Sequence, residues 1–162
     1  MIISLPVILL SALVPMVLGF LWYGPMLFGK VWQAETGITD EQIKGDNMPL
    51  MMGLGYVFAA MLAFALNGVV IHQNALGSLL MDEAISLDMK TALEAVQVGV
   101  ADSFRSFKHG LIHGSFAGLF IALPLFASNA LFERKSAKYV AVNAGYWIVT
   151  LALMGGIICQ FT

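Results

Sequence analysis

The sequence predicts an all-α integral membrane protein. Of its 162 residues, 59% are hydrophobic and only 11% are charged, and the mean hydropathy is +0.85. A soluble domain carries about 25% charged residues. Four stretches contain no charged side chain at all, and they cover residues 1–29, 47–81, 109–132 and 139–162. Each can hold the roughly 20 apolar residues that cross a bilayer, and helix is expected because lipid cannot satisfy open backbone groups.

We therefore expect a single membrane domain, residues 1–162, built as an antiparallel bundle of four transmembrane helices. The spans are expected at about residues 3–23, 50–72, 109–130 and 139–160. The first apolar stretch ends in Trp22 and Tyr23, an aromatic pair typical of a membrane interface, so a retained span is expected in place of a cleaved signal peptide. Pro15 and Pro124 fall within spans and predict kinks. In the first loop, the run TDEQ at 39–42 has the pattern of a capping box and predicts a short helix after Gly37.

The long second loop contains a helical pattern of its own. Over about residues 86–107, apolar residues recur at spacings of three and four, namely Met89, Leu93, Val96, Val100, Phe104 and Phe107. This predicts an amphipathic helix on the outer surface of the membrane, leading into the third span. Such a helix either caps the bundle or acts as a gating or partner-docking element.

Basic residues predict the orientation. The first and third loops hold five of them, Lys30, Lys44, Arg134, Lys135 and Lys138. The second loop holds three, Lys90, Arg105 and Lys108. The positive-inside rule then predicts a multi-pass protein of the bacterial inner membrane with both termini extracytoplasmic.

The three histidines are the candidate metal ligands. His109 and His113 are four residues apart on one helix face, and His72 ends the preceding span at the same membrane boundary. Imidazoles at this spacing can chelate one metal ion, with His72 as a third ligand and Asp102 or water as a fourth. The alternatives are a haem ligand, a proton relay, or interfacial histidines bonded to water, lipid headgroups or backbone. The single cysteine, Cys159, excludes a metal site built from cysteines.

Small residues on the third span predict close helix packing. Gly110, Gly114 and Gly118 recur every four residues, so another helix backbone can approach them. Ala141 and Gly145 form a weaker stripe on the fourth span. The stripe of Gly110, Gly114 and Gly118 then contacts either the Ala141 and Gly145 stripe of the same chain or a second copy.

A second group of residues lies at the predicted cytoplasmic boundary. It consists of aromatic, charged and amide side chains that flank the first, third and fourth spans: Trp22, Tyr23, Lys30, Glu133, Arg134, Asn143 and Tyr146. Aromatic belts and basic loops commonly anchor membrane proteins. The alternative is a small polar pocket that opens to the cytoplasm.

Two segments resemble the signatures of a known family. The run GFLWYGPMLFGKVW, residues 19–32, is similar to the opening signature of the DUF1761 family. LFERK at 131–135, NAGYW at 143–147 and MGG at 154–156 are similar to its closing signature. The resemblance implies a small bacterial membrane protein with four spans, and the longer middle loop resembles a bacteroidete version. It implies no activity, catalytic residue or cofactor.

The functional expectation is a non-enzymatic protein. The sequence has no nucleophile elbow, Walker A loop or His-Glu-x-x-His motif. We expect a protein that acts by assembly, as a homo-oligomer or as a small subunit of a larger membrane complex. A small channel or carrier formed by an oligomer is one alternative, and a metal- or haem-binding protein is another. Membrane lipid is an expected partner, whereas the net charge of −2 offers no basic field for nucleic acid.

Overall fold

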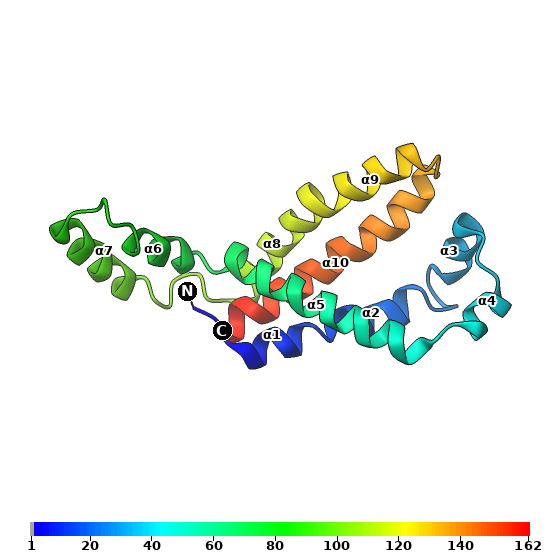
Figure 1. The fold of residues 1–162 in the computed structure, drawn as a ribbon, viewed down its shortest axis with the longest axis horizontal. Coiled ribbons are helices and arrows are strands. Elements are labelled where there is room, and N and C mark those ends of the chain that lie inside the picture. Colours follow the sequence, from blue (N-terminus) through cyan, green and yellow to red (C-terminus); the bar gives the residue numbers. More distant parts are fainter. Residues whose placement is uncertain (1) are drawn as a thin grey trace.

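The computed structural model describes residues 2–162, and every regular element in that part of the chain is helical. Four segments are long and apolar enough to cross a membrane: Leu5–Trp22, Met48–Val70, Phe107–Phe132 and Ala137–Phe161. Their ends lie close to the predicted bounds. Successive segments run in opposite directions between the two ends of the molecule (Figure 1).

Two of these segments are interrupted at proline. The first consists of α1 (Leu5–Ser11) and α2 (Val14–Trp22), with Pro15 in the first turn of α2. The third consists of α8 (Phe107–Ala117), the π-helical turn η1 (Gly118–Ala122) and α9 (Leu123–Phe132), with Pro124 in the first turn of α9. Proline lacks the N–H that would continue the hydrogen-bond ladder and clashes with the preceding turn. The interruptions therefore fall where kinks were expected.

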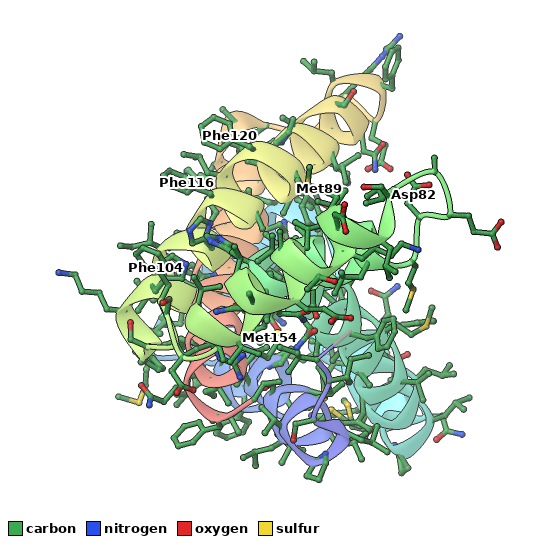
Figure 2. All side chains as sticks on the ribbon, turned by 90° about the vertical axis from the view of Figure 1, so that its left-hand side faces the viewer. Asp82, Met89, Phe104, Phe116, Phe120 and Met154 are labelled. Carbon is green, nitrogen blue, oxygen red and sulfur yellow. The ribbon has the colours of Figure 1, made fainter. Side chains whose placement is uncertain are left out.

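The last helix, α10 (Ala137–Phe161), forms the centre of the structure. It is the most buried of the four segments, and α8 packs along it while α5 (Met48–Val70), α1 and α2 pack on its other sides. Met154 and Ile158 are fully buried in the core, together with Ile71 at the end of α5. Met154 lies in the interior in Figure 2. The position of every other span therefore depends on contacts with α10.

Two short helices follow the first span at one end of the molecule. They are α3 (Gly29–Thr36) and α4 (Asp40–Gly45). Gly37 ends α3 with a left-handed φ of 76°, which a residue without Cβ adopts at little cost. Thr39 and Gln42 then form the reciprocal hydrogen bonds of a capping box, as the sequence predicted.

The second loop forms a pair of helices at the opposite end. These are α6 (Gln73–Leu80) and α7 (Leu87–Gly99), which pack on each other and project beyond the spans beside both termini (Figure 1). We call residues 73–99 the α6–α7 hairpin. The predicted helix over residues 86–107 is shorter in the structure, because turns replace it after Val100. The amide of Gln73 donates to the carbonyl oxygens of Val100 and Ser103, at 2.8 and 2.9 Å, and so holds these turns against the start of α6.

Candidate functional site

His72 lies at the corner between α5 and α6. Ile71 before it is fully buried, which fixes the end of the second span in the core. The side-chain amide of Asn74 donates to Oδ1 of Asn67 at 3.0 Å, and both residues are buried. This bond joins the last turn of α5 to the first turn of α6, so the backbone that carries His72 is tied on both sides.

The other two histidines lie on the first two turns of α8. Ser106 caps this helix, and its hydroxyl accepts a hydrogen bond from the backbone N–H of His109. His113 follows one turn later on the same face. The cap therefore fixes where α8 begins. It places both imidazoles at the same end of the molecule as the α6–α7 hairpin.

The structure brings the three imidazoles together. The ring centroids are 4.8 Å apart for His72 and His109, 4.6 Å for His72 and His113, and 4.4 Å for His109 and His113. One ring nitrogen from each lies within 4.8 Å of those of the other two. We call His72, His109 and His113 the histidine cluster. Asp102, expected as a further ligand, has an exposed side chain in the preceding turns and is not part of it.

The cluster lies partly at the surface. His72 is exposed, whereas His109 and His113 are half-buried. Nε2 of His109 is nevertheless buried and has no hydrogen-bond partner within residues 2–162. Burying a polar nitrogen without a partner costs about 1–3 kcal/mol. The cluster therefore contains an imidazole nitrogen that a ligand would satisfy.

Phe104 lies beside the cluster in an unusual conformation. Its φ is 60°, a genuine outlier for a bulky residue, and its ring centroid is 5.1 Å from that of His109. The thiol of Cys159 donates to the carbonyl oxygen of Phe104 at 3.2 Å and holds this turn against α10. Figure 2 shows Phe104, Phe116 and Phe120 along the same side of the third span. The sequence did not predict the left-handed φ of Phe104, since glycine and asparagine are the residues that commonly adopt it.

The cluster offers the donor atoms that a nitrogen-donor metal site would use. Metal–nitrogen bonds of about 2.0–2.1 Å place tetrahedral ligand nitrogens about 3.3 Å apart. The observed separations are within 4.8 Å, so the nitrogens would have to move closer together to coordinate one ion. Three neutral imidazoles would leave one position of a tetrahedral ion for water or another ligand.

The glycine stripe is occupied within the chain. A Cβ added to Gly110 would lie 2.1 Å from the carbonyl oxygen of Gly155, and one added to Gly114 would lie 2.1 Å from that of Leu151. At Gly118 it would lie 2.5 Å from Cα of Ile148. The stripe therefore packs against the backbone of α10, which leaves it unable to contact a second copy at the same time.

Gly145 lies elsewhere on α10. A Cβ added there would be 3.3 Å from the ring of Trp22, so this glycine faces the end of α2 while Gly110, Gly114 and Gly118 face a different stretch of α10. The expected contact between the two small-residue stripes is thus replaced by two separate contacts, one with α8 and one with α2.

Four members of the predicted boundary group converge. The hydroxyl of Tyr23 donates to Oδ1 of Asn143 at 3.0 Å, and the indole N–H of Trp22 donates to the carbonyl oxygen of Val142 at 3.1 Å. Tyr146, whose ring centroid is 5.1 Å from that of Tyr23, donates to the carbonyl oxygen of Pro15. We call these residues the Tyr23 network. It joins the first span to α10 at the α3–α4 end, while the side chains of Lys30, Glu133 and Arg134 are exposed there.

Comparison with known families decides the identity of the chain. The sequence model of a family described as "protein of unknown function (DUF1761)" matches residues 6–159, nearly the whole chain. The chain belongs to the DUF1761 family. The resemblance found in residues 19–32 and in the closing segments is thereby confirmed. No curated protein matches this DUF1761 chain, and no solved structure matches it.

Proposed function

We propose that this DUF1761 protein binds one transition-metal ion at the histidine cluster. The observation that carries the proposal is the convergence of three imidazoles from the α5–α6 corner and the start of α8, with one nitrogen of each within 4.8 Å of the others. The buried, unpartnered Nε2 of His109 supports it, because coordination would satisfy that atom. The bound ion would join the α5–α6 corner to α8.

The arrangement favours a bare ion over haem. Two axial histidines of a haem approach the iron from opposite faces of the macrocycle, whereas histidines four residues apart on a helix chelate one ion from the same side. The centroids of His109 and His113 are 4.4 Å apart, which leaves no room between them for a macrocycle. Imidazole ligands suit Zn²⁺, Cu²⁺, Fe²⁺ and Ni²⁺, and Co²⁺ binds the same kind of site more weakly than Zn²⁺.

Titration of the purified protein with Co²⁺ tests this proposal. Co²⁺ reports its coordination by absorption, and Zn²⁺ should displace it. We expect one ion per chain. His72→Ala and His113→Ala each remove a direct ligand, so they should weaken binding by more than the roughly 10–100-fold that the loss of an outer-shell partner costs. Ser115→Ala is the matched control, because Ser115 lies on the same helix but bonds only to the backbone of Leu111. Equal binding by all four proteins would refute the proposal.

The proposal includes a location and an orientation. We place the protein in the bacterial inner membrane as an antiparallel four-span bundle, with lipid as its main partner and both termini outside. The excess of basic residues in the first and third loops supports this orientation. In this orientation the α6–α7 hairpin and the histidine cluster lie on the outer side. We propose a binding role without catalysis, in keeping with the lack of catalytic motifs in the sequence.

Assembly is a second candidate function, and exposed apolar side chains beyond the spans favour it. On the α6–α7 hairpin and its connecting turn these include Leu79, Met81, Leu87, Met89 and Val98. Because the glycine stripe is occupied within the chain, the hairpin is the better candidate surface for contact with a second copy or another subunit. Leu87→Glu should dissociate such an assembly in detergent, as measured by light scattering, while Met26→Glu, at an exposed position after the first span, should not. A wild-type protein that is monomeric and purifies alone would contradict this candidate.

A further inference from the structure

An apolar groove of about 430 Å³ lies at the end of the molecule opposite the histidine cluster. Trp22, Phe28 and Val31 form one wall, and α10 forms the other with Ala141, Gly145 and Lys138. We call this feature the Trp22 groove. Lys138 is the only charged residue among those that line it. An occupant would therefore combine an apolar body with an anionic end.

The walls of the groove are fixed by contacts already formed. The indole N–H of Trp22 is bonded to the carbonyl oxygen of Val142, and the rings of Trp22 and Phe28 pack with centroids 4.7 Å apart. Gly145 keeps α10 close to the indole without filling the space beside it, since a Cβ there would lie 3.3 Å from the ring. The indole thus presents hydrocarbon to the groove and no free donor.

The position and charge of the groove indicate what fills it. Trp22 is the last residue of the first span and Ala137 is the first residue of the fourth, so the groove lies at the boundary of the apolar region. Residues 133–138 carry three basic side chains, Arg134, Lys135 and Lys138, against one acid, Glu133. The neighbouring α3 adds one charge of each sign, Lys30 and Glu35, and Glu35 accepts a hydrogen bond from Ser136, so basic groups still outnumber acids there. Lysine at such a boundary extends toward lipid headgroups while its stem stays among apolar groups.

We propose that the Trp22 groove binds an anionic phospholipid, with an acyl chain along Trp22 and Gly145 and the headgroup phosphate beside Lys138. This site is separate from the histidine cluster and does not depend on metal binding. One lysine near an anionic headgroup should favour an anionic over a neutral lipid by about fivefold.

Quenching of tryptophan fluorescence by brominated lipid tests the proposal directly. The chain has three tryptophans, so Trp32→Phe and Trp147→Phe leave Trp22 as the single reporter. In vesicles of neutral phosphatidylcholine, brominated phosphatidylglycerol should quench Trp22 at about one fifth of the mole fraction that brominated phosphatidylcholine needs. Lys138→Gln should remove this preference, whereas Lys90→Gln on α7, far from the groove, should leave it intact.

Three results would overturn the proposal. Equal quenching by the two lipids would show that the groove does not select charge. A preference that persists in Lys138→Gln would place the selectivity elsewhere. Lack of quenching by either lipid would show that protein covers the groove, and a second copy would then be identified by recovery of quenching on dilution of the protein in the vesicles. Gly145→Val provides a further check, because filling the groove should reduce quenching by both lipids.

Discussion

The ring centroids of His72 and His113 lie 4.6 Å apart, with the rings nearly perpendicular at 88°, although His72 follows the second span and His113 lies in the third. The contact depends on two local features. The bond between Asn67 and Asn74 fixes the corner that carries His72, and the Ser106 cap fixes the start of α8. Together with α10, against which both spans pack, they set the distance across which a metal ion would bind.

Acidification should release a metal ion from the histidine cluster. Metal and protons compete for the same imidazole nitrogens, so each histidine must be neutral to act as a ligand. We expect bound Co²⁺ to be lost between about pH 7.5 and pH 5, the range in which imidazoles usually gain their protons. The measurement is cobalt absorption during a pH titration. Release with the same pH profile in His72→Ala and His113→Ala would mean that the ion binds to groups other than these histidines.

Adding a methyl group to the third span should be highly destabilising at Gly114. In Gly114→Ala the new Cβ would lie 2.1 Å from the carbonyl oxygen of Leu151, so α8 and α10 must separate. We expect a loss in the free energy of unfolding at or above the 1–3 kcal/mol typical of overpacking. Thermal unfolding in detergent measures it.

The matched control for this substitution is Gly68→Ala on α5. Gly68 is exposed, and a Cβ there would meet no atom within 4 Å. Alanine should therefore leave stability unchanged or raise it by about 0.5–1 kcal/mol, the usual gain over glycine inside a helix. If both variants unfold at the wild-type temperature, the close contact between α8 and α10 does not contribute to stability.

The sequence predicted the spans from the stretches without charge and the kinks from proline, because neither signal depends on how the helices pack. It also predicted the Thr39 capping box, which depends on local chemistry alone. The face that each helix turns toward the core was harder to predict from the sequence, since lipid-facing and core-facing positions are both apolar in a membrane protein. Gly145 was for this reason assigned to the same contact as the glycines of α8, whereas it faces Trp22. The sequence predicted that the three histidines lie at the same depth in the membrane. Predicting the distances between them would also have required the orientation of α8 about its own axis.

The turns before α8 illustrate another limit. Apolar residues at helical spacing continue through Val100, Phe104 and Phe107, and they predicted a longer helix than α7. The helix ends because Gln73 bonds to the carbonyl oxygens of Val100 and Ser103, which a continuous helix would use internally. A contact between residues distant in sequence thus overrides the local pattern.

Chemical labelling should establish which end of the molecule faces the cytoplasm. Single cysteines at Lys44 and Lys135, introduced into a Cys159→Ser background, should react with a membrane-impermeant reagent only after the cells are opened. A cysteine at Thr162 should react in intact cells. Reaction of position 44 but not 162 from outside would reverse the orientation and place the histidine cluster on the cytoplasmic side.

Tyr23 should make the stability of the protein fall at alkaline pH. Burial, reinforced by the neighbouring Tyr146 and Tyr139, raises the pKa of the Tyr23 hydroxyl above its ordinary value of 10.0. Its contribution to stability is therefore fully present below pH 10 and is lost as the pH rises above 10 toward the raised pKa, because the unfolded chain ionises first.

Comparison with Tyr23→Phe isolates this contribution, since the variant keeps the ring and loses the ionisable hydroxyl and its bond to Asn143. Near neutral pH the variant should be less stable by about 1 kcal/mol, the usual net value of a hydrogen bond. Between about pH 9 and pH 11 the difference should narrow by up to about 1 kcal/mol, after allowance for the partial exposure of the side chain. Unfolding in detergent at each pH provides the measurement. A constant difference across this range would mean that Tyr23 ionises equally readily in the folded and unfolded chains, which would contradict its burial in the Tyr23 network.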